Sequence, residues 1–228
     1  MNTTTNTTTP QKGSSIDEAL GQTEFGGWIS QNKMPVISAV VVLIVGIFAY
    51  GIFDHFKTER ENKYSSALHQ VVKDKLTPFR EGKIEAAELV KSFNDQWLEM
   101  GSFVGAGTFV VQVVDALMAK NKYAEAYALV ADADQRISNP QLSYFFNIRA
   151  AALAEDLGKK KEAITHLKKI AGSGIKYFES KVYLDLGRLY LETGDKEKAR
   201  SSFQFVIDEG KEVEFKKVAR LYLEELEG

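Results

Sequence analysis

The pattern of apolar and polar residues divides the chain into three segments that predict different structures. Residues 1–33 are mostly polar, residues 34–53 are apolar and uncharged throughout, and residues 54–228 carry apolar residues at helical spacing. Apolar residues that recur every three or four positions favour an amphipathic helix, whereas an uninterrupted apolar run of about 18 or more favours a membrane span. We therefore expect a polar tail, one hydrophobic helix and a helical domain, in that order.

Residues 1–33 are expected to form a polar, largely disordered N-terminal tail. The run Met1–Thr9 consists almost entirely of Asn and Thr, and Pro10 follows it. A segment of this composition buries too little apolar surface to offset the loss of chain entropy on folding. We expect disorder above all in residues 1–14.

Residues 34–53 are expected to form a transmembrane helix. The run contains no charged residue, and at about 1.5 Å per residue it would extend about 30 Å, the thickness of a bilayer's hydrocarbon core. Lys33 and Asp54 border it, and Trp28 precedes it where aromatic rings favour the membrane interface. A soluble core helix is rarely apolar on every face, and a cleaved signal peptide has a shorter apolar region. An uncleaved span is therefore favoured over both alternatives.

Residues 54–228 are expected to be helical throughout, because helix-forming residues dominate and helix breakers fall between the periodic segments. The clearest unit covers residues 180–213, with small residues at Gly187 and Ala199. This unit resembles the tetratricopeptide repeat, in which small residues let two paired helices, A and B, cross closely. Larger residues surround the two small ones at the spacings of that repeat: Tyr183, Leu186, Tyr190, Phe203 and Val206.

Two earlier units repeat this pattern, over residues 107–143 and 144–177. The alanine of helix B recurs in all three units, as Ala126, Ala163 and Ala199, at intervals of 37 and 36 residues. A unit with a small residue at each helix crossing, lengthened by a few loop residues, accounts for these intervals.

Two further elements complete the expected domain. A degenerate unit is expected over residues 68–97, and residues 213–226 are expected to form the capping helix that a solenoid needs at its end. The predicted fold is thus all-α: a tetratricopeptide-like helical solenoid over residues 54–228 that follows one N-terminal transmembrane helix.

The A helices of such repeats line a curved groove that suits an extended peptide or a partner helix. In this alignment of the three units, the fifth position of each A helix faces the groove, and Val111, Ile148 and Leu184 occupy it. Neighbouring positions on the same helices carry charges of both signs. A register shifted by one residue would move this set, and the domain's own residues 54–80 could fill the groove instead; both alternatives stay open. The expected partner-binding residues are Val111, Asp115, Met118, Phe145, Ile148, Glu155, Lys181, Leu184, Arg188 and Leu191.

Composition argues against catalytic and nucleic-acid chemistry. A formal net charge of −2 gives no basic field for nucleic acid, and the absence of cysteine removes thiolate ligands and nucleophiles. His55, His69 and His166 lie in charged helical segments without partners at metal-ligand spacing, so we expect all three to be exposed. We expect a non-enzymatic protein with no cofactor, metal, nucleic acid or small-molecule substrate. Its partners would be proteins, and residues 34–53 would contact a membrane.

Several short motifs accompany this layout: Trp28 ahead of the span, Glu81-Gly82-Lys83 and Ala86-Ala87 after the first soluble helix, and the turns Lys122-Tyr123-Ala124-Glu125-Ala126 and Gly194-Asp195-Lys196-Glu197-Lys198-Ala199. Together with the single span, they resemble the YfgM-like family of ancillary subunits of the SecYEG translocon over about residues 25–228. The resemblance implies a bacterial inner-membrane protein with a cytoplasmic N-terminus and a periplasmic domain. It also implies contacts with translocon subunits, a membrane-anchored periplasmic chaperone and newly secreted chains.

The charges beside the span favour the opposite orientation. Lys57, Arg60 and Lys63 follow the span, whereas only Lys12 and Lys33 precede it, and the positive-inside rule would then place the large domain in the cytoplasm. An alternative function therefore stays open: a scaffold that tethers another membrane or envelope assembly, such as one for division or secretion.

Overall fold

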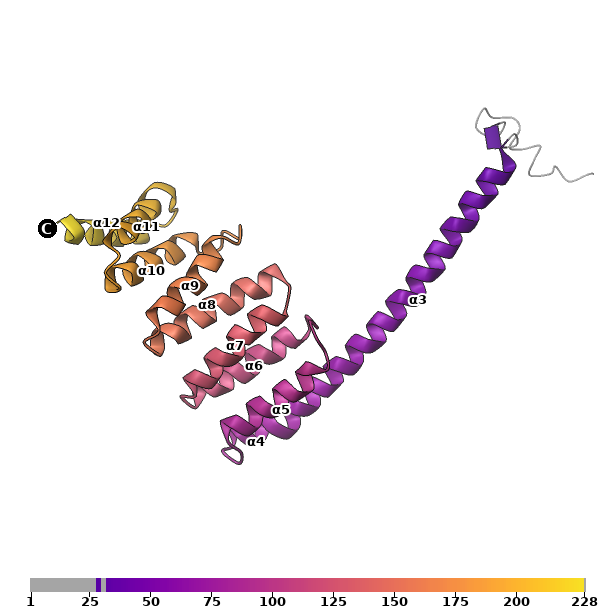
Figure 1. Ribbon diagram of the computed structural model, residues 1–228, viewed down its shortest axis with the longest axis horizontal. Coiled ribbons are helices and arrows are strands. Elements are labelled where there is room, and N and C mark those ends of the chain that lie inside the picture. Colours follow the sequence, from indigo (N-terminus) through magenta and orange to yellow (C-terminus); the bar gives the residue numbers. More distant parts are fainter. Residues whose placement is uncertain (1–27, 30–31, 228) are drawn as a thin grey trace, which may run out of the picture. The chain divides into compact units, whose positions relative to one another are not determined.

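The protein is all-α in the part of the chain that the computed structural model describes, residues 28–29 and 32–227, which contains no strand. The predicted fold, a tetratricopeptide-like helical repeat domain preceded by one apolar helix, is confirmed (Figure 1). The expected disorder of residues 1–14 lies outside the described residues. The elements are α3 (Lys33–Val71), the π-helix η1 (Val72–Leu76), α4 (Thr77–Arg80), α5 (Ala86–Leu98), α6 (Ala106–Ala119), α7 (Tyr123–Arg136), α8 (Pro140–Asp156), α9 (Lys160–Ala171), α10 (Glu179–Glu192), α11 (Lys196–Glu209) and α12 (Val213–Glu227).

The chain divides into two compact units, Met1–Glu59 and Arg60–Gly228. In the first unit, every side chain of α3 from Ile37 to Phe53 is exposed, although most of them are apolar. A helix that is apolar on every side is normally buried, either in a protein core or in a membrane. The helix is long and apolar enough to cross a membrane.

The second unit is built from helices that pack in chain order, each on its neighbour (Figure 1). Six of these helices form three successive pairs: α6–α7, α8–α9 and α10–α11. The recurring alanines Ala126, Ala163 and Ala199 have no exposed surface. A buried methyl group at each of these positions takes up little space, as the close crossing of two paired helices expected from the sequence requires.

Glycine at position 187 serves the same purpose in α10. A Cβ atom built at Gly187 would lie 2.7 Å from Cδ1 of Phe203 in α11, closer than side-chain carbons normally approach. The Phe203 ring is fully buried and stacks on Tyr222 of α12 at a centroid distance of 4.8 Å. Phe203 thus belongs to the core through which the last helix packs on the third pair.

The region of the expected degenerate unit, residues 68–97, holds the end of α3, η1, α4 and α5. Phe93 and Trp97 of α5 have no exposed surface and meet edge to face at 5.6 Å. Tyr64 contacts Phe103 before α6 in the same edge-to-face manner, and His69 contacts Phe109 in α6. The aromatic residues among them, without the exposed His69, belong to one continuous core with the first helix pair.

Helix α8 has a side-chain cap that allows a local test of stability. Asn139 Oδ1 accepts a hydrogen bond from the Leu142 N–H at 2.9 Å, and Pro140 occupies the first turn, where its missing N–H costs nothing. We expect Asn139→Ala to lower the free energy of unfolding by about 1 kcal/mol, because this N–H loses its partner. Denaturant unfolding measures the loss, with Asn62→Ala, at an exposed position in α3, as the control. Equal stability of the two variants would contradict the capping role.

Candidate protein-binding surface

Helices α6, α8 and α10 are the first helices of the three pairs, and ion pairs join them to one another. Arg149 in α8 pairs with Asp115 in α6. Arg188 in α10 pairs with Glu155 in α8 at 2.7 Å. We call the surface that carries these side chains the A-helix face. Both ion pairs link one repeat to the next, and three of their four members were expected on this face.

The Arg188–Glu155 pair belongs to a chain of four alternating charges. Arg188 also contacts Glu192 at 2.8 Å, and Glu192 contacts Lys160 in α9 at 2.9 Å. Hydrogen bonds, first with Glu155 and then with Glu192, raise the pKa of Arg188 above its ordinary value. Hydrogen bonds from Lys160 and Arg188 lower the pKa of Glu192. Because the pairs are partly exposed, each contributes about 0–1 kcal/mol to stability. Their main effect is to hold the charges in fixed positions.

A depression of about 280 Å³ lies between α8 and α10, beside the Arg188–Glu155 pair. It contains three of the expected partner-binding residues, Glu155, Lys181 and Arg188. Lys181 is held by Asp185 at 2.6 Å. The depression thus presents fixed charges of both signs around a small apolar floor. The residues that line it are Ala151, Ala152, Glu155, Asp156, Leu167, Lys181, Asp185 and Arg188.

The apolar residues expected in the groove differ in their exposure. Leu184 is 9% exposed and belongs to the core that α10 shares with α11 and α12. Phe145 is 39% exposed and lies under the Arg149 guanidinium, 4.9 Å from the ring centroid. Of the expected apolar set, Phe145 offers the most accessible surface to a partner. The others are half-buried and pack against the core clusters: Val111, Met118, Ile148 and Leu191.

Two charged residues on this face were missing from the expected set. Arg149 lies four positions after Phe145, and Asp185 lies four positions after Lys181. Residues four apart share one face of a helix. The spacing therefore contained a signal that could have placed both residues beside the ones that were named.

The expected exposure of His166 is wrong. This residue is 7% exposed, because it lies three positions after Ala163 on the buried face of α9. Its Nδ1 lies 2.8 Å from Asn147 Oδ1, and its Nε2 lies 3.2 Å from the Tyr127 hydroxyl. Asn147 in turn donates to Asp134 at 2.7 Å. His55 and His69 are exposed, and the described residues contain no cluster of three metal-ligating side chains.

The buried imidazole predicts a pH dependence of stability. Burial lowers the pKa of His166 below its ordinary value of 6.5, and Lys169 lowers it further, while Asp134 and Glu162 act in the opposite direction. Below pH 6.5 the unfolded chain therefore binds more protons than the folded chain, until the pH falls below the folded-state pKa. Over that interval, we expect the free energy of unfolding to decrease by up to about 1.4 kcal/mol per pH unit through this residue.

Urea unfolding of the full chain at neutral and mildly acidic pH measures this decrease. The matched variant is His166→Gln, which keeps a polar side chain and removes the titrating group. We expect a smaller decrease in the variant than in the unchanged protein. An identical decrease in both would show that His166 does not couple folding to pH.

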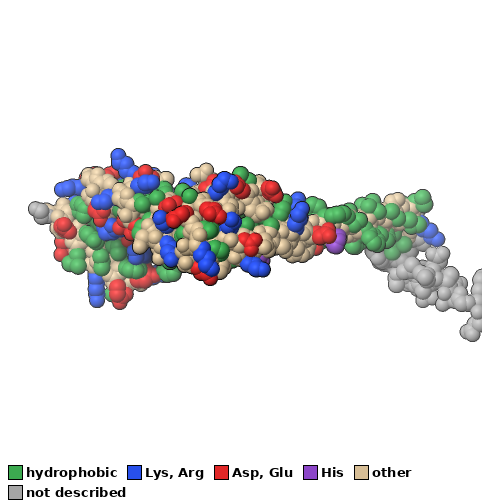
Figure 2. Space-filling model, turned by 90° about the horizontal axis from the view of Figure 1, so that it is seen from below, with side chains coloured by type: hydrophobic (Ala, Val, Ile, Leu, Met, Phe, Trp, Pro, Cys, Tyr) green, Lys and Arg blue, Asp and Glu red, His purple; other side chains and the backbone are tan. Residues whose placement is uncertain are grey.

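Charges of both signs are interspersed over the visible face of the helical domain (Figure 2). Apolar side chains gather instead on the N-terminal helix α3 in the same view. This face therefore shows no large field of one sign that would attract a polyanion. It suits partners that are recognised by local pairs of charges.

Comparisons with known proteins place these features in a family. Residues 27–228 match the family of tetratricopeptide repeat-like domains. No curated protein matches the chain. Among solved structures, a mutant of MamA is 18% identical, with a TM-score of 0.36; the match covers 70% of this chain and 98% of that one.

Proposed function

We propose, from the premise that this chain belongs to the tetratricopeptide repeat-like domain family, that it is a membrane-anchored subunit that binds protein partners through its A-helix face. Domains of this family are protein-interaction scaffolds and are generally non-enzymatic. Their stacked helix pairs present extended surfaces for partner segments. The protein-binding role follows from the family, and the choice of surface follows from the geometry of α6, α8 and α10.

One observation carries the choice of surface: the depression between α8 and α10, in which ion pairs hold charges of both signs in place. Charged side chains that are already oriented lose less conformational entropy when a partner binds. Phe145 adds an exposed aromatic ring on the same helix α8. Exposed aromatic rings beside arginines are typical anchors of protein interfaces. The A-helix face therefore suits an amphipathic helix or an extended segment with charges of both signs.

The anchor in this proposal is the apolar part of α3, residues 34–53. Its length and composition support a single span, which would hold the domain beside the bilayer. A tethered binding domain meets membrane-bound partners at a raised effective concentration, so modest affinities suffice.

The more specific form of the proposal assigns the partners to protein secretion. The motifs Glu81-Gly82-Lys83 and Lys122-Tyr123-Ala124-Glu125-Ala126 support a role resembling that of the YfgM-like translocon subunits. In this form, the domain lies in the periplasm of a bacterial inner membrane and contacts translocon subunits or a membrane-anchored chaperone. Lys57, Arg60 and Lys63 favour the second candidate, a scaffold with its domain in the cytoplasm.

Reporter fusions after residue 228 separate these two candidates. A reporter that is active only in the periplasm would support the translocon proposal, and one that is active only in the cytoplasm would contradict it and favour the scaffold. The binding surface itself does not depend on this result, because both candidates use the A-helix face.

Co-purification of partners with the full chain from detergent-solubilised membranes tests the proposed surface. Phe145→Asp places a charge on the exposed ring position, and we expect it to remove the proteins that co-purify with the unchanged chain. The matched control is Leu98→Asp, because Leu98 is 64% exposed on α5 and lies off the A-helix face. Loss of partners in both variants or in neither would contradict a binding surface at Phe145.

A further inference from the structure

The two junctions between consecutive repeats are built from equivalent positions but filled differently. At the first junction, Asp134 of α7, Asn147 of α8 and His166 of α9 meet through hydrogen bonds of 2.7 and 2.8 Å. The alanine spacing gives the residues of the next repeat that are equivalent to these three. An equivalent residue lies 37 positions later from α7 to α9, and 36 positions later from α8 to α10 and from α9 to α11. The equivalent residues at the second junction are therefore Ala171, Tyr183 and Ser202.

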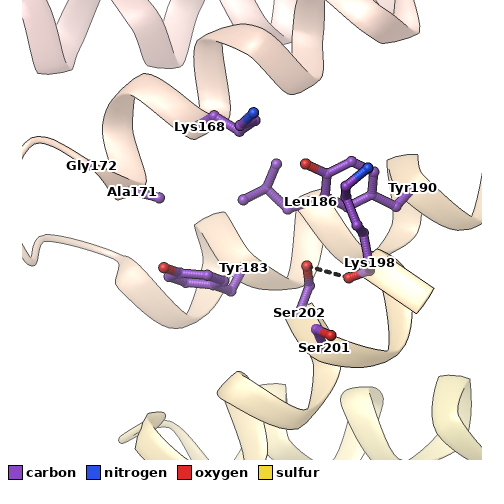
Figure 3. Close-up of a pocket in the computed structure, with 9 residues that line it drawn as sticks. All are labelled: Lys168, Ala171, Gly172, Tyr183, Leu186, Tyr190, Lys198, Ser201 and Ser202. Atoms are coloured by element: carbon purple, nitrogen blue, oxygen red, sulfur yellow. Dashed lines mark hydrogen bonds between the residues drawn. The ribbon is translucent and has the colours of Figure 1, made fainter. Parts of the chain in front are cut away.

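These replacements leave the second junction open. All three of its residues line a cleft of about 360 Å³ between α9 and α11, with α10 at its floor (Figure 3). Ala171 and Ser202 are too small to fill the space that Asp134 and His166 occupy at the first junction. The Tyr183 ring stacks instead on Phe205 at a centroid distance of 3.7 Å. In the close-up, it lies on the opposite side of the cleft from Tyr190 and Lys198. The cleft is thus a local departure from the filled junction.

The lining of the cleft combines an apolar floor with a cationic rim. Leu186 and Tyr190 form part of the floor, and Lys168 and Lys198 come from the two flanking helices (Figure 3). The ammonium group of Lys198 contacts Asp195 at 2.5 Å and lies 5.5 Å from the Tyr190 ring centroid. Within the described part of the chain, Lys168 has no ion pair. None of the side chains that line the cleft is acidic.

We propose that this cleft binds an acidic peptide segment of a partner protein, with an aromatic or aliphatic side chain on the floor and a neighbouring carboxylate between Lys168 and Lys198. A volume of about 360 Å³ lies at the lower end of the range of ligand sites, and suits one large side chain and its neighbour. Lys168 has no ion pair among the described residues, and it supplies a positive charge that favours an anion beside Lys198, which already contacts Asp195. The apolar floor favours a segment that also carries an apolar side chain. None of the residues that line this cleft lines the depression between α8 and α10, so the proposal does not rest on the A-helix face.

Selection from a displayed library of short random peptides tests this proposal on the full chain in detergent. We expect the selected peptides to carry Asp or Glu beside an aromatic residue or Leu. A synthetic copy of a selected peptide should bind about tenfold more weakly to the Lys168→Gln, Lys198→Gln double variant, because it loses charge-assisted contacts. The same peptide with its acidic residues replaced by amides should show a similar loss with the unchanged protein.

Two further variants sharpen the result. Lys161→Gln is the matched control, because Lys161 is an exposed lysine on the same helix α9 but outside the cleft, and we expect it to bind as the unchanged protein does. The triple variant Ala171→Asp, Tyr183→Asn and Ser202→His copies the filled first junction and should abolish binding. Selection of peptides without acidic residues, equal binding to the Lys168→Gln, Lys198→Gln variant, or failure to select any peptide would overturn the proposal.

Discussion

Gly187→Leu is expected to destabilise the third helix pair together with the last helix. A Cβ at this position already overlaps the buried Phe203 ring, and a leucine adds three more carbon atoms at the same crossing. The ring cannot move aside freely, because it stacks on Tyr222 with the two planes 4° apart. Overpacking of this kind costs about 1–3 kcal/mol, which corresponds to a fall in the thermal midpoint of about 2–4 °C per kcal/mol in a domain of this size.

Thermal unfolding of the full chain in detergent, followed by its helical circular dichroism, measures this change. The control is Ala87→Leu, which adds the same side chain at an exposed position of α5. Combining Gly187→Leu with Phe203→Ala should lower the stability by less than the sum of the two single changes, because the smaller side chain makes room for the larger one. An unchanged midpoint for Gly187→Leu alone would show that this helix crossing is not closely packed.

Deletion of residues 34–53 is expected to move the protein from the membrane fraction to the soluble fraction. The deleted segment contains the exposed apolar side chains of α3. Each Leu, Ile, Val or Phe at the centre of a span favours insertion by about 0.3–0.6 kcal/mol. Alkaline extraction of membranes followed by centrifugation measures the distribution. Deletion of residues 2–14 is the control and should leave the protein in the membrane. Continued membrane association without residues 34–53 would refute their role as the anchor.

The fold could be predicted because closely packed helices require small residues at regular intervals, and these intervals are visible in the sequence. A helix crossing needs a small residue, so the positions of Ala126, Ala163 and Ala199 report the repeat before any contact is known. An apolar run without charges reports the helix at residues 34–53 in the same way. Both features depend on residues near one another in the chain, and periodicity is sufficient to find them.

Burial and side-chain contacts at the surfaces depend on residues from different helices. Periodicity along the sequence does not predict them. His166 appeared exposed because its sequence neighbours are charged, but Asn147 and Tyr127 of two other helices surround it. Asn147 belongs to the same buried polar network, because it also donates a hydrogen bond to Asp134. The open second junction likewise follows only when Ala171 and Ser202 are compared with their equivalents in space.

Site-specific photocrosslinking in cells tests the central claim, that partners bind the A-helix face, most directly. A photoreactive residue at position 145, on the exposed edge of α8, is compared with one at position 128, where Ala128 is exposed on α7. The account predicts adducts with another protein from position 145 and none of comparable yield from position 128. Equal yields from both positions, or adducts from position 145 only with the protein's own residues 54–80, would contradict it.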